Sequence, residues 1–235
     1  MKWTVLSDNR TCNNLLKTEH GLSILLETEK HRILLDTGAS DVFIRNAERL
    51  GIDLSMVDYV FISHGHSDHA GGLRHLMEIN NKGKVVVSPD AMSGKFYSKR
   101  GNLHHILAEW PKIDDDRLVL TDQTCAVAED IQVIAHIPQN HPMPKGNTNL
   151  YVQNTAGEPT EQREPSSSLE WPSRDGSRRS QTEEELTVLA QRLKAKYSET
   201  LFYTSHCTGD KVFATLKTIM GNQLHAFSCG MTITV

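Results

Sequence analysis

Three histidines and one aspartate crowd six consecutive residues of the sequence, His64-Gly65-His66-Ser67-Asp68-His69. Imidazole nitrogens and carboxylate oxygens are ligands of divalent transition metals. His64 and His66 are two residues apart, so their side chains leave an extended segment on the same side and can bind one ion together. Asp68 and His69 follow where the chain is expected to turn, and can reach a second ion nearby. This HxHxDH spacing predicts a metal site; the alternative is a polar surface loop that happens to contain three histidines.

The histidine loop lies between two elements that can hold it rigidly. The run before it, Tyr59–Ile62, is short and consists of aromatic and β-branched residues, which predicts a buried strand. After it, Gly71 and Gly72 lead into an apolar-periodic segment with Leu73 and Leu76, which predicts a short helix. A strand-to-helix loop is fixed by its flanks yet free of sheet hydrogen bonds, and metal ligands need both conditions.

Hydrolysis is the chemistry that such a site favours. Two ions can share a bridging hydroxide, because metals lower the pKa of bound water toward neutrality. We predict attack of this hydroxide on an electrophilic carbon or phosphorus, with Asp68 as the catalytic residue that binds metal and orients the nucleophile. Imidazole and carboxylate ligands predict one or two divalent transition metals, zinc before manganese or iron. No serine or cysteine of the sequence stands in a nucleophile-elbow pattern.

Two further candidate residues are expected at strand ends. His206 follows the predicted strand Leu201–Thr204 and precedes a helix predicted from Asp210 to Met220, which repeats the arrangement of the histidine loop. We predict His206 as another metal ligand; the alternative is a core histidine. Asp36 ends a predicted strand, where it can orient a ligand imidazole through a hydrogen bond or cap a turn, and both interpretations stay open.

The remaining pattern alternates strands and helices. Ser40 is the predicted N-cap of a helix that runs to Leu50, with Gly51 as its stop. Thr182 is the predicted N-cap of a helix that runs to about Tyr197, with a buried face of Leu186, Leu189, Ala190 and Leu193. Further strands are predicted at 3–6, 23–27, 32–36, 84–88, 224–227 and 231–235, and a second sheet from 117–121, 124–127 and 131–137.

A basic segment is the one candidate for substrate binding. Lys95, Lys99 and Arg100 are interleaved with Phe96 and Tyr97, and such a group can bind an anionic or phosphorylated substrate. The alternative is a solvated face with two half-buried rings.

Composition limits the class of protein. A chain of 235 residues fits one α/β domain with a sizeable core. The net charge of −4 gives no indication of nucleic-acid binding, and no apolar run approaches the length of a membrane span. The four cysteines are dispersed, so no disulfide framework is predicted, and we expect a cytoplasmic protein with a small-molecule substrate. Residues 154–181 are polar and nearly free of apolar residues, which predicts a flexible insertion.

Several motifs together carry a family resemblance. They are Glu19-His20-Gly21-Leu22-Ser23, Leu34-Leu35-Asp36-Thr37-Gly38, the segment from Ser63 to Leu73, and His206-Cys207-Thr208-Gly209. With them the sequence resembles the metallo-β-lactamase superfamily, and within it the branch named after 7,8-dihydropterin-6-methyl-4-(β-D-ribofuranosyl)aminobenzene-5′-phosphate synthase, most of whose members are called metal-dependent hydrolases. The resemblance covers roughly residues 4–150 and 182–235.

The resemblance implies a fold and a ligand set. The fold is a single four-layer αββα sandwich of two mixed sheets, face to face with helices outside, and the metal site lies at the edge of the sheets. His64 and His66 would serve one metal, while Asp68, His69 and His206 would serve the other.

One departure from the family pattern affects the first metal. Members of the branch carry a Gly-Cys-Ser-His-like segment that supplies a third histidine, and also a bridging carboxylate; the polar stretch 154–181 takes its place here. Candidate substitutes are His141 for the histidine and Glu183, Glu184 or Glu185 for the carboxylate.

Three functions therefore stay open. The first is a metal-dependent hydrolase of a small ester, lactone or phosphoester. The second is a transferase that joins a pterin diphosphate to an aminobenzene ribose phosphate. The third is a non-catalytic metal-binding protein with a decayed site. The missing histidine segment favours the third function. The intact Asp68 argues against it, because a purely structural site gains little from an acid that can steer water.

Overall fold

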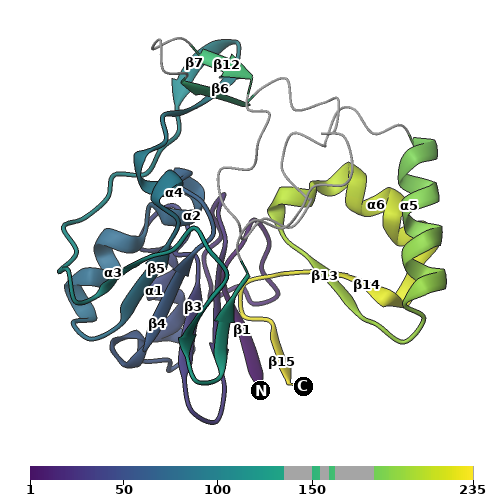
Figure 1. Ribbon diagram of the computed structural model, residues 1–235. Coiled ribbons are helices and arrows are strands. Elements are labelled where there is room, and N and C mark those ends of the chain that lie inside the picture. Colours follow the sequence, from purple (N-terminus) through teal and green to yellow (C-terminus); the bar gives the residue numbers. More distant parts are fainter. Residues whose placement is uncertain (135–149, 154–158, 162–182, 235) are drawn as a thin grey trace.

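A mixed sheet forms the centre of the computed structural model, which describes residues 1–134, 150–153, 159–161 and 183–234. Its outer strands on one side are antiparallel, and the four strands from β3 to β8 are parallel. In order across the sheet the strands are β15 (Thr232–Thr234), β1 (Lys2–Ser7), β2 (Ser23–Glu27), β3 (Arg32–Leu35), β4 (Tyr59–Ile62), β5 (Lys84–Val87) and β8 (Leu118–Leu120) (Figure 1).

Helices cover one face of this sheet. The face buries Leu34, Val60 and Val85 against Phe43 of α1 (Val42–Arg49) and Leu76 of α3 (Leu73–Ile79), and all five side chains are buried. The continuous apolar character of the short central strands follows from this burial, since parallel strands are covered on both faces.

A hairpin covers part of the opposite face. It consists of β9 (Cys125–Ala128) and β10 (Ile131–Val133). Val133 packs with Ile33, Phe61 and Val86 in a second buried cluster. Strands on one side and helices on the other confirm the layered α/β sandwich that the family resemblance implies.

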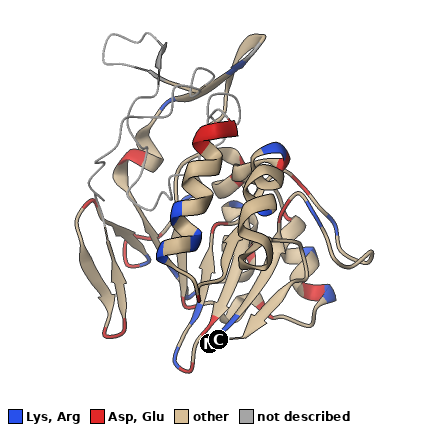
Figure 2. Ribbon diagram, turned by 90° about the vertical axis from the view of Figure 1, so that its right-hand side faces the viewer, with Lys and Arg blue, Asp and Glu red and all other residues tan. Residues whose placement is uncertain are grey.

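The C-terminal part forms its own small core. The helices α5 (Glu183–Lys196) and α6 (Asp210–Met220) pack together beside the parallel pair β13 (Phe202–Thr204) and β14 (Leu224–Ala226), at the right of Figure 1. The buried residues are Leu186, Ala190, Val212, Leu216, Met220 and Leu224. Figure 2 shows α5 with an acidic first turn and basic residues near its end. These charges interact favourably with the helix dipole and stabilise the helix.

An arm of four strands rises beside the histidine loop, at the top of Figure 1. Its strands, in order, are β12 (Pro159–Glu161), β11 (Leu150–Gln153), β6 (Phe96–Arg100) and β7 (Asn102–His105). The short helix α4 (Pro89–Ser93) precedes it. After β7 the chain forms backbone hydrogen bonds with the histidine loop: Ser67 N donates to Ile106 O, and Ala108 N donates to Gly65 O.

Some sequence predictions need correction. Residues 117–121 were expected in the second sheet, but β8 is the edge of the main sheet and runs parallel to β5. The reason is that Leu118 packs on the helix side and Val119 on the hairpin side, so that both faces of β8 are covered. The N-cap of α1 is Asp41, although Ser40 Oγ still accepts a hydrogen bond from Val42 N.

Other predictions are confirmed, with one exception. Gly51 follows α1 with a φ of 70°, the left-handed conformation of a helix stop. The hairpin of β2 and β3 and the bounds of α6 are as predicted. Leu189 of α5 is 41% exposed, however, because α5 packs through a narrow stripe around Leu186 and Ala190.

Thr182 lies outside the described residues. So does most of the stretch 154–181, within which β12 is described as a strand. Among the described helices, none is long and apolar enough to cross a membrane.

Candidate metal centre

Close backbone packing fixes the histidine loop. It follows β4 and leads into α2 (Ser67–Ala70) and then α3. A Cβ atom on Gly65 would lie 1.9 Å from Ala91 O of α4, and one on Gly72 would lie 2.1 Å from Thr37 O. Only glycine permits these approaches, so the loop is clamped from both sides.

Five imidazole rings from three separate segments meet around this loop. Their centroids form a chain with steps of 4.5 Å from His66 to His64, 4.1 Å from His64 to His69, and 5.2 Å from His69 to His206. His20 completes the chain, with its centroid 4.7 Å from that of His206. The structure therefore brings together the four histidines that the sequence predicts as ligands, and adds a fifth.

The carboxylate of Asp68 lies among these rings. Its Oδ2 atom is 3.3 Å from His20 Nε2, 3.4 Å from His206 Nε2 and 3.9 Å from His69 Nε2. Burial alone would raise the pKa of Asp68, but His69, His20 and His206 together hold that pKa well below its usual value of 3.8. Asp68 is therefore an ionised acceptor at neutral pH.

Asp36 braces two of the imidazoles. Its Oδ2 atom lies 2.7 Å from His69 Nδ1 and accepts a hydrogen bond from Ser63 Oγ at 2.7 Å. Ser63 Oγ lies 2.8 Å from His64 Nδ1, which is placed to donate to it. These contacts engage the Nδ1 atoms and leave Nε2 as the ligand nitrogen of each ring. Of the two roles left open for Asp36, the contact with a predicted ligand imidazole is thus present.

The backbone of Asp36 is shaped for this contact. Its φ of 56° is the only positive value among the described residues other than glycine. Asp36 Oδ1 accepts a hydrogen bond from Ser63 N, which holds the turn. Burial lowers the pKa of His69, but the carboxylates of Asp36 and Asp68 outweigh burial and raise that pKa well above its usual value of 6.5.

The N-terminal region positions His206. The side chain of Asp8 is buried, and its Oδ2 atom accepts a hydrogen bond from His206 N at 3.2 Å. His206 begins a single 3-10 turn that ends before Gly209, whose φ is 74°. Burial raises the pKa of Asp8 in spite of the nearby His206 and Arg10. The residue that follows β1 and the last histidine motif are therefore joined at the site.

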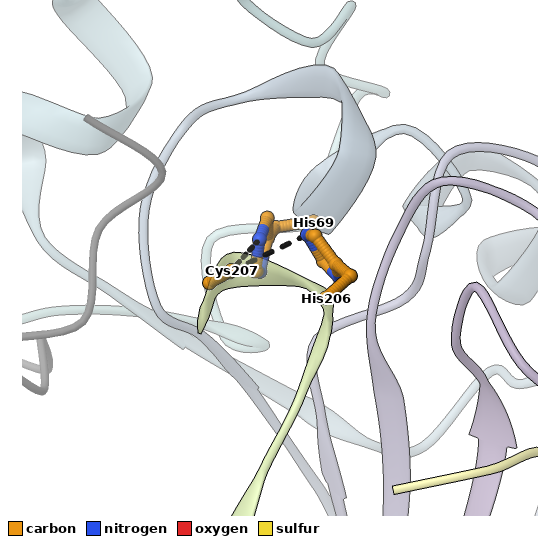
Figure 3. A group of neighbouring side chains, drawn as sticks. All are labelled: His69, His206 and Cys207. Atoms are coloured by element: carbon orange, nitrogen blue, oxygen red, sulfur yellow. Dashed lines mark hydrogen bonds between the residues drawn. The ribbon is translucent and has the colours of Figure 1, made fainter. Parts of the chain in front are cut away.

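Cys207 adds a sulfur to the cluster (Figure 3). Its Sγ atom lies 3.4 Å from His206 Nε2 and 3.7 Å from His69 Nε2. Burial raises the pKa of the Cys207 thiol, but its contacts with His206 and His69 outweigh burial and lower the pKa to about 6. For His206, burial is likewise outweighed by Asp68 and Cys207, and its pKa rises to about 9.

The donor set fits a divalent transition metal. Three overlapping groups of side chains have ligand atoms that all lie within 4.8 Å of one another. Nitrogen, carboxylate oxygen and sulfur are the donors that zinc binds. The groups are His64, Asp68 and His69; His20, Asp68 and His206; and His69, His206 and Cys207.

Sequence reasoning assigned no role to His20 or Cys207. In the motifs quoted above, His20 follows Glu19 and Cys207 follows His206. Their place in these motifs was the available signal that they belong to the site. Glu19 itself is a structural residue, since its carboxylate accepts hydrogen bonds from Ala39 N and Ser40 Oγ.

The other candidates lie elsewhere. His141 is outside the described residues. Glu184 is exposed in the first turn of α5, and the described contacts do not join it to the cluster. Lys95 and Lys99 are exposed, while the ring of Phe96 between them contacts His66 with centroids 5.3 Å apart. Because side chains alternate along a strand, Lys99 lies on the face of β6 opposite Phe96, and Lys95 directly precedes the strand.

For Arg100 the structure describes only the backbone, in β6. Anion binding by Lys95, Lys99 and Arg100 stays a prediction.

Comparison with known proteins gives the class. Residues 16–144 match the family model of the metallo-beta-lactamase superfamily, which is more than half of the chain. The protein belongs to this superfamily. The fold agrees with that of the crystal structure of Tm1679, described as a metal-dependent hydrolase of the beta-lactamase superfamily: the TM-score is 0.77 at 20% identity, over 100% of this chain and 99% of the other.

Two relatives from Methanocaldococcus jannaschii are similar in sequence. An uncharacterized protein is 31% identical over 141 residues, which cover 58% of this chain and 54% of that protein. A 7,8-dihydropterin-6-methyl-4-(beta-D-ribofuranosyl)-aminobenzene-5'-phosphate synthase is 34% identical over 100 residues, or 40% of this chain and 34% of that protein. The chain thus matches about half or less of the length of these relatives.

Proposed function

We propose that the protein is a metal-dependent hydrolase of a small ester, lactone or phosphoester. The observation that carries this proposal is the position of Asp68, whose ionised carboxylate lies within 3.9 Å of nitrogen atoms from His20, His69 and His206. A bound divalent metal supplies an activated water and polarises the substrate oxygen. Membership of the superfamily and the donor set of the cluster support a metal-dependent activity.

The protein's own residues have separable roles in this proposal. Asp68 accepts a hydrogen bond from the attacking water and so orients it toward the substrate. Asp36 and Ser63 hold the rings of His69 and His64 in place, so that binding needs little rearrangement. The ring of Phe96 closes the site beside His66 and excludes water from that side.

Metal content is the first measurement. The full chain is purified without chelator and its metals are counted by elemental analysis; we expect one or two transition-metal equivalents per chain. Removing them with a chelator should lower the melting temperature, because free metal at a hundred times its dissociation constant stabilises a protein by about 2.7 kcal/mol. No bound metal, even after zinc, manganese or iron is added back, contradicts the proposal and favours a decayed site.

Activity is then tested on the loaded protein. Nitrophenyl esters, a lactone and a nitrophenyl phosphodiester are the substrates, and turnover should stop after chelation. Asp68→Asn should lower the rate about 10²- to 10⁴-fold, the usual contribution of a positioned acid or base. Asp115→Asn, a change of the same kind at an exposed position, should leave it unchanged. A fully loaded protein that hydrolyses none of these substrates, but joins a pterin diphosphate to an aminobenzene ribose phosphate, would instead be a transferase.

A further inference from the structure

Cys207 adds a thiol to two of the imidazoles around Asp68, and the ligand atoms of His69, His206 and Cys207 all lie within 4.8 Å of one another. Asp68 Oδ2 and Cys207 Sγ each lie 3.4 Å from His206 Nε2. From His69 Nε2, Asp68 Oδ2 lies 3.9 Å away and Cys207 Sγ lies 3.7 Å away. All four residues are at least partly buried, and they come from the histidine loop and from the turn after β13.

These separations can be compared with those of a tetrahedral zinc site. Zinc lies about 2.0–2.2 Å from nitrogen and oxygen ligands and about 2.3 Å from sulfur. At tetrahedral angles, two ligand atoms are then about 3.4 Å apart for nitrogen with oxygen and about 3.5 Å apart for nitrogen with sulfur. The separations of Cys207 Sγ from His206 Nε2 and His69 Nε2, 3.4 and 3.7 Å, agree with such nitrogen–sulfur edges to within about 0.2 Å.

We propose that Cys207 is a metal ligand, and that His69, His206 and Cys207 would hold one zinc ion together. The proposal rests on the metal-dependent function above and deepens it, because it adds a sulfur donor to the metal centre. Three protein ligands leave a fourth position open, as catalytic zinc sites do. Asp68, whose Oδ2 atom lies 3.4 Å from His206 Nε2, stays available for the role proposed above.

The sulfur donor also decides which metals this site prefers. Thiolate is a soft ligand that suits zinc and cobalt, whereas manganese and magnesium favour oxygen ligands. The site that contains Cys207 should therefore bind zinc or cobalt and leave manganese to a site without sulfur.

His20 competes with Cys207 as a further ligand beside His206. Its Nε2 atom is 3.3 Å from Asp68 Oδ2, and its ring is next to that of His206. The side chain of His20 is 47% exposed, however, so it is less firmly held than ligands within the core. A nitrogen and a sulfur ligand have different cobalt spectra, which makes the two possibilities separable.

Cobalt substitution of the full chain tests the proposal. The metal-free protein is titrated with cobalt(II) under anaerobic conditions, and its near-ultraviolet and visible absorption are recorded. We expect a thiolate-to-cobalt charge-transfer band that is present in the wild type and in Cys125→Ser and absent in Cys207→Ser. Zinc affinity should fall at least about tenfold in Cys207→Ser, since loss of a residue that merely orients a ligand already costs that much.

Each outcome is decisive. Cobalt binding without the thiolate band in the wild type overturns the role of Cys207 but leaves the proposed function intact. Absence of any metal binding overturns both. Because Cys207→Ser could fail to fold, alkylation of the wild-type thiols is compared with and without zinc and mapped by mass spectrometry. Zinc should protect Cys207 but not Cys12, which is exposed; equal alkylation of Cys207 in both states overturns the proposal.

Discussion

Asp36 Oδ2 lies 2.7 Å from His69 Nδ1, and the two side chains are only 5% and 4% exposed. The pair connects the end of β3 to the first turn after β4, through a residue with a φ of 56°. This contact fixes both the tautomer and the direction of the His69 ring. The charge and the shape of Asp36 can therefore be tested separately.

Replacing Asp36 with Asn should weaken metal binding with little loss of stability. Asparagine tolerates the left-handed backbone and can still accept from Ser63 N, but it removes the charge beside His69. We expect metal affinity to fall about 10- to 100-fold. Asp36→Ala removes the acceptor as well, and should also cost about 2 kcal/mol of unfolding free energy. Competition with a chromophoric chelator and urea unfolding of the metal-free protein measure the two effects.

Asp115→Asn is the matched control for this pair, because Asp115 is exposed and changes in the same way. An Asp36→Asn protein that binds metal as tightly as the wild type would show that Asp36 is only a turn residue.

His69→Ala and His206→Ala should lower bound metal by similar amounts. Both rings offer Nε2 to the same neighbourhood, at 3.9 and 3.4 Å from Asp68 Oδ2. Elemental analysis of the two purified variants gives the comparison, and His75→Ala, on α3, serves as the control. Full metal content in His206→Ala would rule out its assignment as a ligand.

Gly65→Ala should be more harmful than Gly51→Ala. A Cβ atom at position 65 meets Ala91 O at 1.9 Å, so the loop or α4 must move, at a cost of about 1–3 kcal/mol. At position 51 the Cβ enters open space, and the penalty comes from the positive φ alone. Only Gly65→Ala should also reduce metal affinity, since it displaces the adjacent histidines. Thermal unfolding and metal titration of both variants measure the two effects. A Gly65→Ala protein that is at least as stable as Gly51→Ala and binds metal equally well would show that the loop is not clamped.

The sequence was most informative where the candidate ligands follow one another along the chain. The spacing of the histidines in the loop and the apolar strand before it are both visible in one short segment, so the geometry of the loop follows from local rules. Asp36 and His206 were predicted because residues at the ends of neighbouring strands tend to lie at one edge of a sheet.

Contacts that depend on long-range packing could not be predicted. His20 precedes β2 in an irregular segment, and no periodicity indicates that it reaches Asp68. The pairing of β8 with β5 could not be predicted either. It depends on other segments covering both faces of this three-residue strand, and the apolar residues of β8 alone do not reveal that. Exposure of Leu189 follows from how narrow the contact between α5 and α6 is, a property of two helices rather than of one.

The pH dependence of stability can be predicted at Asp58, which directly precedes β4 and lies outside the histidine loop. Its carboxylate accepts hydrogen bonds from Arg32 N and Lys82 Nζ, each at 2.9 Å. Burial would raise the pKa of Asp58, but these two partners outweigh burial and lower it below 3.8. The unfolded state therefore binds the proton more readily, so the stabilisation is complete above the unfolded pKa and is lost as the pH falls through the lower folded pKa.

Asp58→Asn isolates this charge, because the amide oxygen can still accept from Arg32 N. The variant should be less stable than the wild type at pH 7 by no more than about 1 kcal/mol, since the side chain is 32% exposed and solvent screens the pair. The difference should persist down to about pH 5 and shrink below about pH 4. Urea unfolding of the metal-free proteins over this range measures it, with Asp115→Asn as the control at an exposed position. A difference that grows as the pH falls would mean that Asp58 does not hold its charge more tightly in the folded state, and would contradict the role of Arg32 and Lys82.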